Sequence, residues 1–254
     1  MQFAVLGSGS KGNATLVRAG QTAVLIDCGF TVQETLNRMA AIAFDPYQLS
    51  AIVVTHEHGD HSKGVVPLSR RLGVPVYASV GTSIALKWHD KQSIEPLIAG
   101  QSTHIGDLEV LPVVVPHDAR EAYQFVIGHR SGRLGILTDL GHITPHVVQS
   151  YQNIDVLLLE ANHDLAMLEA GPYPPALKRR VGGPWGHLNN DQSAEFLQQL
   201  NLAQLQYIVI AHVSEQNNSL ERARSVISEA IPEHAHKLMM SHQDQPSTWC
   251  TIEP

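Results

Sequence analysis

The stretch Thr55-His56-Glu57-His58-Gly59-Asp60-His61 holds three histidines and an aspartate within six positions. It directly follows the apolar run Ala51-Ile52-Val53-Val54, which predicts a short buried strand. Core packing needs none of these polar side chains at a strand end, whereas imidazole and carboxylate groups are common metal ligands. We therefore expect this strand to bring a cluster of metal ligands to one edge of a sheet.

The spacing within this stretch predicts two ions. His56 and His58 are two positions apart, so on an extended segment their side chains point to the same side and can bind one ion. Gly59 permits a turn that allows Asp60 and His61 to reach a second ion. A single histidine here would be interpreted as an ordinary polar loop residue, but the whole cluster favours a metal site.

Other predicted strands also end in side chains that can bind a metal. Strands are expected at residues 3–6, 13–18, 23–26, 49–54, 74–78, 123–129, 133–137, 155–159, 207–211, 237–240 and 248–251, and residues 105–115 form either two strands or one long bent strand. Helices are expected after the N-cap Thr31 and at residues 63–72, 81–88, 145–151, 191–200 and 220–230, and a long loop at residues 171–186. The strand-end residues are Asp27, His56, His117, Asp139, His163 and His212. Strands that run toward the same edge bring such residues into one shared site.

The segment Gly7-Ser8-Gly9-Ser10-Lys11-Gly12 matches the dinucleotide-binding pattern G-x-G-x-x-G. That pattern binds a pyrophosphate only where a helix begins at the glycines. Residues 13–18 instead alternate and include β-branched side chains, which predicts a second strand. We therefore interpret the segment as a glycine-rich turn between two strands.

The composition is that of an ordinary globular protein. Its 254 residues, 43% of them hydrophobic, suffice for one domain with a buried core. No apolar run reaches the roughly 18 residues that a membrane span needs. The N-terminal residues lack the basic segment of a secretion signal, so we expect a cytoplasmic protein in which Cys28 and Cys250 are free thiols. The net charge of −7 argues against a broad basic surface for nucleic acid, but it allows a small basic site.

In the order and spacing of its strand-end residues, the sequence resembles the metallo-β-lactamase superfamily. The pattern is an early aspartate, the motif H-x-H-x-D-H, and then a distant histidine, aspartate and histidine. It matches Asp27, His56, His58, Asp60, His61, His117, Asp139 and His212. The resemblance implies one α/β domain over residues 1–254, a four-layer αββα sandwich of two mixed β-sheets flanked by helices.

Shorter motifs narrow the resemblance to the bacterial YycJ (WalJ) group, which is associated with 5′-to-3′ DNA exonuclease activity. They are Gly7-Ser8-Gly9-Ser10-Lys11-Gly12-Asn13, Glu160-Ala161-Asn162-His163-Asp164, Gly171-Pro172-Tyr173-Pro174, Leu177-Lys178-Arg179-Arg180, Gly186-His187-Leu188 and Ala211-His212-Val213-Ser214 with Asn217-Asn218. Two of them, Gly186-His187 and His212-x-Ser214, are also similar to motifs of tRNA 3′-processing endonucleases. Asn189 stands where several of these groups have serine.

The resemblance implies a ligand set for two divalent metal ions. One ion would be bound by His56, His58 and His117, the other by Asp60, His61 and His212, with Asp139 bridging them. Asp27 is interpreted as orienting a ligand imidazole through the other ring nitrogen. Zinc suits such ligands, and manganese or iron suits them as well.

Charge favours a phosphodiester as the substrate of such a centre. Two divalent ions, two aspartates and a bridging hydroxide leave about +1 at the reacting group, and paired ions supply a hydroxide near neutral pH. Asp60 is counted among the catalytic residues, and His187 is the candidate acid for the leaving oxygen, oriented by Asp164 or His163. Candidate phosphate contacts are Lys178, Arg179, Arg180, Ser214, Asn217 and Asn218, the last three of which are equally suited to fixing the loop beside His212.

The sequence thus favours a nuclease that acts on DNA, and three alternatives stay open. The first is an RNA-processing nuclease of the tRNA 3′-endonuclease type. The second is a hydrolase of small lactam or thioester substrates, which would need an apolar pocket and no cations at residues 178–180. The third is a metal-binding module without catalysis, for which a complete set of water-activating ligands would have no purpose.

Overall fold

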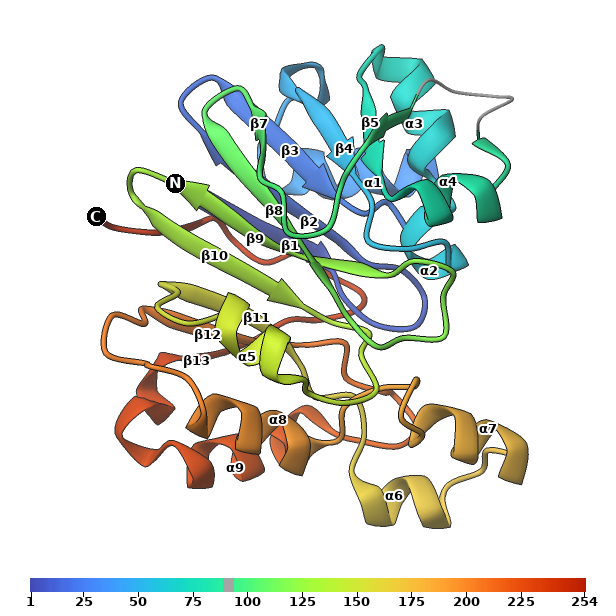
Figure 1. Ribbon diagram of the computed structural model, residues 1–254, viewed down its shortest axis with the longest axis vertical. Helices are drawn as coiled ribbons and strands as arrows, with labels where there is room; N and C mark the ends of the chain where they lie inside the picture. Colours follow the sequence, from blue (N-terminus) through green and yellow to red (C-terminus); the bar gives the residue numbers. More distant parts are fainter. Residues whose placement is uncertain (89–93) are drawn as a thin grey trace. The chain divides into compact units, whose positions relative to one another are not determined.

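The computed structural model describes residues 1–88 and 94–254, and the following statements concern these residues (Figure 1). They form two compact units. The first unit comprises Met1–Val114, Ala119–Gly132 and His242–Pro254, and the second comprises Val115–Asp118 and Arg133–Ser241. We describe each unit by itself, and the expectation of a single domain stays a prediction.

A seven-stranded mixed sheet forms the centre of the first unit. Its strands lie in the order β14 (Cys250–Thr251), β1 (Gln2–Gly7), β2 (Ala14–Ala19), β3 (Thr22–Ile26), β4 (Ala51–Val53), β5 (Val76–Ala78) and β6 (Ile94–Pro96). Strands β14 to β3 pair antiparallel, and β3 to β6 pair parallel. The glycine-rich residues 7–12 therefore connect two antiparallel strands, which excludes a dinucleotide-binding helix there and confirms the predicted turn.

The first unit also contains helices and three further strands. They are α1 (Val32–Ala41), the 3₁₀ helix η1 (Pro46–Gln48), α2 (Gly59–Ser62), α3 (Val65–Leu72), α4 (Val80–Ala85), β7 (Thr103–Ile105), β8 (Leu108–Val114) and β9 (Tyr123–His129). Thr31 caps α1 as predicted, because its side chain accepts a hydrogen bond from the Glu34 amide. Helices α1 and α3 contact strands of the seven-stranded sheet, and Met39 and Leu68 are fully buried in this core.

The second unit is built on four parallel strands. They are β10 (Gly132–Leu137), β11 (Val156–Glu160), β12 (Tyr207–Ala211) and β13 (Leu238–Met240), in this order. The helical segments are α5 (Pro145–Ser150), α6 (Leu165–Ala170), α7 (Pro175–Val181), α8 (Asn190–Gln198), α9 (Leu220–Ala230) and the 3₁₀ helix η3 (Pro232–Lys237). Helices α8 and α9 pack against each other (Figure 1). The two central strands, β11 and β12, are almost entirely apolar and buried, as parallel strands covered on both faces require.

The strand register explains why polar residues gather at one edge in each unit. In the first unit Ile26 of β3 pairs with Val53 of β4, so Asp27 and the histidine-rich stretch follow neighbouring parallel strands. In the second unit Leu137 lies beside Leu159, and Glu160 lies beside Ala211. The carboxyl ends of parallel neighbours meet at one edge, where ligand sites of α/β sheets normally lie.

The predicted fold class is confirmed, because the described strands belong to two mixed sheets of seven strands and helices flank them. One local prediction was wrong. Residues 171–186 are not one long loop but contain α7, because Pro175 at the first turn and the helix-forming residues after it favour a helix. The helix expected at residues 63–72 is present as α3, and the short helix α2 precedes it. Of the two possibilities for residues 105–115, the structure has two strands, because they contain the end of β7 and the whole of β8. None of the helices in the described part of the chain combines the length and apolar character that crossing a membrane requires.

Candidate metal centre

In the first unit, three imidazole rings of the histidine-rich stretch lie against one another. His56 Nε2 is 3.0 Å from His58 Nδ1, and the rings of His56 and His61 are 4.3 Å apart. His56 and His61 are fully buried, and His58 is half-buried. Two nitrogens that each lie about 2.0–2.1 Å from one zinc ion are roughly 2.9–3.4 Å apart, so the spacing of His56 and His58 suits one ion.

Asp27 fixes the orientation of His61. Its carboxylate accepts hydrogen bonds from the backbone amide and the hydroxyl of Thr55, both 2.8 Å long, and Oδ2 lies 2.7 Å from His61 Nδ1. Burial raises the pKa of Asp27, whereas His61 acts to lower it. With Nδ1 held by the carboxylate, Nε2 is the nitrogen that can face a metal ion, and the Asn13 side-chain amide lies 3.0 Å from it in this structure. This contact supports the orienting role predicted for Asp27, which stays a prediction.

Glycine is required next to this cluster. A Cβ atom on Gly29 would lie 1.7 Å from the carbonyl oxygen of Asp60 and 2.8 Å from the amide of Asn13. Two backbone hydrogen bonds hold the same crossing, from the Asn13 amide to the Asp60 carbonyl and from the Cys28 amide to the His61 carbonyl, each 2.8 Å long. The loop after β3 thus packs directly onto the backbone that presents Asp60 and His61.

In the second unit, four side chains at the ends of three strands and one loop form a compact cluster. Asp139, Glu160, His187 and His212 offer ligand atoms that all lie within 4.8 Å of one another. His212 Nδ1 is 3.0 Å from Asp139 Oδ1 and 3.2 Å from Glu160 Oε1. His187 Nδ1 is 2.8 Å from the same Glu160 oxygen. Asp139, Glu160 and His212 are buried, so the cluster is held inside the unit.

Opposite charges compensate one another in this cluster. Burial alone would lower the pKa of His212, but the Asp139 and Glu160 carboxylates raise it to about 10. The same two carboxylates raise the pKa of His187 against the effect of its burial. Burial would likewise raise the pKa of Glu160, which the two histidines hold at about 2. Buried charges persist in proteins when they are paired in this way or bind a metal.

His117 is oriented by the loop that carries His187. Its Nδ1 lies 3.1 Å from the carbonyl oxygen of Gly186, which can only accept, so Nδ1 carries the proton. Nε2 is then the nitrogen that can face a metal, and Asp118 Oδ1 lies 3.5 Å from it in this structure. The rings of His117 and His187 are 5.4 Å apart. Both side chains belong to the second unit, and they lie at one place although the sequence separates them by 70 residues.

Three residues of the predicted site have a left-handed backbone. The φ angles are 60° for Asp27, 55° for Asp139 and 51° for His212. Asp27 and His212 directly follow a strand, and Asp139 stands two positions after the end of β10. Residues other than glycine adopt this conformation rarely, at a cost of about 1–3 kcal/mol, and such residues concentrate at functional sites. In each case the turn lies at the carboxyl end of a strand.

The donor groups of both units fit a divalent metal such as zinc. They are imidazole nitrogens and carboxylate oxygens, partly preoriented through a second ring nitrogen. Cysteine is not among them: Cys28 and Cys250 are buried free thiols of the first unit, and burial raises the pKa of Cys28 to about 12. The number of ions and their identity belong to the proposal below.

The carboxylate beside His187 is Glu160, and the prediction of Asp164 or His163 in that position was wrong. Asp164 instead caps α6 through the Met167 amide and lies 2.8 Å from the Arg222 guanidinium. Burial lowers the pKa of His163 to about 4, so its ring is neutral, and neither ring nitrogen has a hydrogen-bond partner among the described residues. Glu160 follows the last apolar residue of a predicted strand, a position that could have identified it.

Two of the predicted phosphate contacts are better explained as structural. Asn218 is buried and bonds to the Ala161 carbonyl at 2.9 Å and to the Asn190 side chain at 2.8 Å. The Ser214 hydroxyl, also buried, accepts the Asn217 amide at 3.2 Å. These bonds fix the loop after His212, which is the second of the two roles considered for Ser214, Asn217 and Asn218.

The cations of residues 178–180 lie on α7 and differ in exposure. Lys178 is half-buried and donates to the Glu169 carbonyl, and Arg180 pairs with Asp118. Arg179 is exposed, and no ion pair to it occurs among the described residues. Arg179 is therefore the most available of the three for a phosphate.

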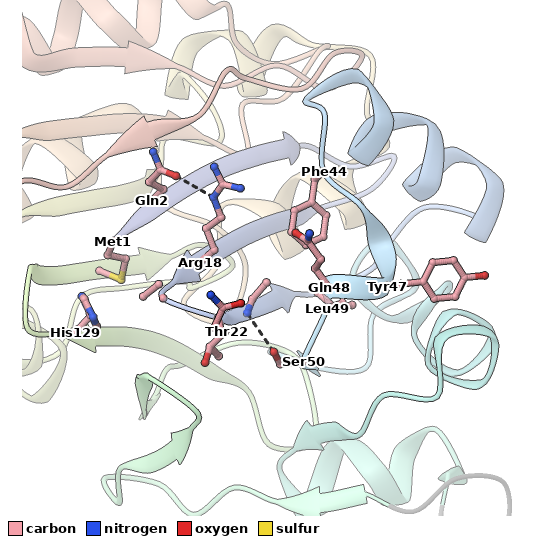
Figure 2. A pocket seen from close by; sticks show the side chains of 14 residues that line it. Met1, Gln2, Arg18, Thr22, Phe44, Tyr47, Gln48, Leu49, Ser50 and His129 are labelled. Atoms are coloured by element: carbon pink, nitrogen blue, oxygen red, sulfur yellow. Dashed lines mark hydrogen bonds between the residues drawn. The ribbon is translucent and has the colours of Figure 1, made fainter.

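A separate cavity of about 650 Å³ lies in the first unit at the beginning of β3 (Figure 2). Arg18, Thr22, Tyr47 and Ser50 are among the residues that line it. Thr22 begins β3 and Asp27 follows its end, so five strand residues, roughly 17 Å, separate the cavity from the histidines of this unit. No cluster of carboxylate and imidazole ligands lines this cavity, and we assign it no part in metal binding.

Comparisons with known proteins identify the family. A family model described as "Beta-lactamase superfamily domain" matches residues 22–210. An exodeoxyribonuclease YycJ of Bacillus anthracis is 31% identical over 239 residues, which cover 92% of this chain and 90% of the relative. A ribonuclease Z of Mycolicibacterium gilvum is 27% identical over 182 residues, 64% of this chain and 53% of the relative. The crystal structure of the metallo-β-lactamase fold protein YhfI from Bacillus subtilis aligns with a TM-score of 0.75 at 15% identity, over 97% of this chain and 98% of that one.

The chain therefore belongs to the β-lactamase superfamily, has the metallo-β-lactamase fold and is a metal-dependent hydrolase. Within this superfamily it is similar over nearly its whole length to the exodeoxyribonuclease YycJ. The resemblance noted in the sequence is thereby confirmed.

Proposed function

We propose that this protein is a dinuclear metal-dependent phosphodiesterase that degrades DNA from the 5′ end. The observation that carries the proposal is the buried cluster of Asp139, Glu160, His187 and His212, which combines metal ligands with a carboxylate-oriented histidine. A nuclease needs both a metal site and a proton donor for the leaving alkoxide. The similarity to an exodeoxyribonuclease over 92% of the chain supports DNA as the substrate.

In this proposal the predicted ligands would bind a pair of ions. The first ion would have His56, His58 and His117 as ligands, the second Asp60, His61 and His212, and Asp139 would belong to both. When bound, the ions supply a nucleophilic hydroxide near neutral pH and neutralise charge on the phosphodiester. Zinc fits these ligands, and manganese or iron would fit them too.

His187 is the residue that protonates the leaving oxygen. Glu160 holds it through the 2.8 Å contact at Nδ1, so Nε2 is the nitrogen that donates to the substrate. Glu160 is itself fixed by the backbone amides of Leu188 at 3.0 Å and Leu140 at 3.3 Å. The paired carboxylate stabilises the protonated ring before transfer, much as a buried aspartate orients the histidine of a hydrolytic triad.

Arg179 binds a phosphate of the flanking strand. Its exposure on α7 and the absence of a paired acid among the described residues leave its five N–H groups available for an anion. A cytoplasmic localisation, which stays a prediction, would suit such an enzyme, because single-stranded DNA ends arise during repair and replication.

The test is a digestion with the metal-free protein restored with zinc or manganese. Single-stranded and duplex DNA and RNA, each with and without a 5′ phosphate, would be compared with a chromogenic lactam. We expect metal-dependent release of nucleotides from 5′-phosphorylated DNA, and Asp139→Ala should bind less metal by elemental analysis and lose this activity while circular dichroism stays unchanged. Faster cleavage of RNA would change the substrate class, and turnover of the lactam alone would refute the phosphodiesterase.

A further inference from the structure

Trp185 exposes its indole ring in the loop that carries the proposed proton donor His187. Its side chain is 58% exposed, whereas Trp88 is buried and Trp249 lies under the guanidinium of Arg18 at 4.0 Å. An aromatic side chain of this size is normally buried, because its apolar surface is the largest of any residue. Trp185 stands two positions before His187, in the loop between α7 and α8.

The backbone around Trp185 is fixed by hydrogen bonds and close packing. Its carbonyl accepts the Asp118 amide at 2.9 Å, and the His187 amide donates to the Val181 carbonyl at 2.9 Å. A Cβ atom on Gly141 would lie 2.2 Å from the Pro184 carbonyl and 2.5 Å from the Trp185 amide, so only glycine allows this approach. The exposed ring is therefore held on a rigid loop, and binding through it would lose little conformational entropy.

The loop that carries Trp185 also carries His187 and contacts His117, two groups of the proposed reaction. The Gly186 carbonyl orients His117, and His187 is the proton donor. The Cα atoms of residues 185 and 187 can be at most about 7 Å apart. Trp185 is therefore within one nucleotide of the phosphate at which His187 is proposed to act. On its other side the loop follows α7, where the Gly183 amide donates to the Arg180 carbonyl at 3.3 Å and the exposed Arg179 belongs to the same helix.

We propose that Trp185 is the platform on which the unpaired base next to the scissile phosphate stacks. This inference rests on the proposed nuclease function and specifies its substrate as an unpaired end. A flat exposed indole near cations suits a nucleobase, because every base has a face that stacks on an aromatic ring while the cations bind the phosphates. A base in a duplex is already stacked on its neighbours, so the strand end must separate before it reaches Trp185.

The experiment compares Trp185→Ala and Trp185→Phe with the wild type on two 5′-phosphorylated single strands. One strand carries normal bases, and the other carries a base-free sugar at the position next to the cleaved bond. Tyr47→Ala is the matched control, because Tyr47 is 75% exposed and lines the separate cavity of the first unit. Metal content is measured in every sample.

On the strand with normal bases, Trp185→Ala should lower kcat/KM about 5- to 150-fold, the range that stacking of one base implies, mainly through KM. Trp185→Phe should recover most of this loss, and Tyr47→Ala should have no effect. On the base-free strand, Trp185→Ala and wild type should be equally slow. Equal losses on both strands, or no loss on either, would overturn the inference.

Fluorescence gives a second readout that needs no turnover. Because Trp185 is the most exposed of the three tryptophans, a stacked base should quench emission when the metal-free protein binds the normal oligonucleotide. The base-free oligonucleotide and the Trp185→Phe variant should show no such quenching. Quenching that persists in Trp185→Phe would refute the stacking role. Cleavage without dependence on Trp185 would refute this inference alone, whereas absence of any nucleic-acid cleavage would refute the proposed function.

Discussion

Replacing Glu160 by glutamine should separate proton donation from every other part of the reaction. Glutamine has nearly the same shape and can still accept a hydrogen bond from His187, but it carries no charge. A hydrogen bond to a charged group contributes about 1.5–3 kcal/mol, and a neutral one about 0.5–1.5 kcal/mol. The difference of roughly 1–1.5 kcal/mol predicts a loss of about 10-fold in kcat, because each 1.4 kcal/mol corresponds to a factor of ten. His187→Ala removes the donor itself and should cost about 10²- to 10⁴-fold.

The assay uses two substrates that differ in their need for a proton. One is a DNA strand, whose leaving alkoxide must be protonated, and the other is a nitrophenyl phosphodiester, whose leaving group departs without a proton. Glu160→Gln and His187→Ala should each slow cleavage of the DNA strand far more than cleavage of the nitrophenyl phosphodiester, with KM nearly unchanged. Glu160 also lies 3.2 Å from His212, so metal content must be measured in each variant. Equal losses on both substrates at full metal content would refute the assignment of His187 as the acid.

Other substitutions test the surroundings of the site. Arg179→Gln should raise KM and reduce the slope of log KM against log salt concentration by about 0.7–0.9. Lys178→Gln should change this slope little, because the Lys178 ammonium is bonded to the Glu169 carbonyl. Ser214→Ala should lower the free energy of unfolding, measured with urea, and leave KM unchanged. Asp164→Ala should lower the free energy of unfolding by about 0.5–2 kcal/mol at pH 7 through loss of the α6 cap. Arg222 lowers the pKa of Asp164 in the folded protein. The stabilisation by Asp164 is therefore complete above its unfolded pKa of about 4 and disappears as the pH falls through the lower folded pKa. Urea titrations of variant and wild type should therefore converge in acid.

The metal-binding stretch was predictable because its signal is local. His56, His58 and His61 follow one apolar run, and the parallel register of β3 and β4 places Asp27 at the same edge of the sheet. The glycine-rich segment after β1 could also be interpreted correctly, since the alternation after it excluded a helix. In both cases the spacing of the apolar residues indicated a strand rather than a helix.

The wrong predictions arose where one strong sequence signal outweighed a weaker one. Glycine and proline in residues 171–186 favoured a loop, although Pro175 is well suited to the first turn of a helix. His163 and Asp164 attracted the role of orienting His187 because they are conspicuous, whereas Glu160 was the last residue of a buried strand. Only the three-dimensional structure shows that Asp164 points to Arg222 and Glu160 to His187.

The left-handed conformations of Asp27, Asp139 and His212 have a consequence for protein engineering. Glycine adopts such angles without strain, and asparagine does so more readily than most other residues. Any search for thermostable variants that scores folding alone will therefore favour glycine at these positions, and each accepted change would remove a group that the proposed metal site needs. Natural sequences that lost the activity would be under no such restriction. Glycine at two or more of these three positions should therefore mark a relative that has kept the fold and abandoned the chemistry.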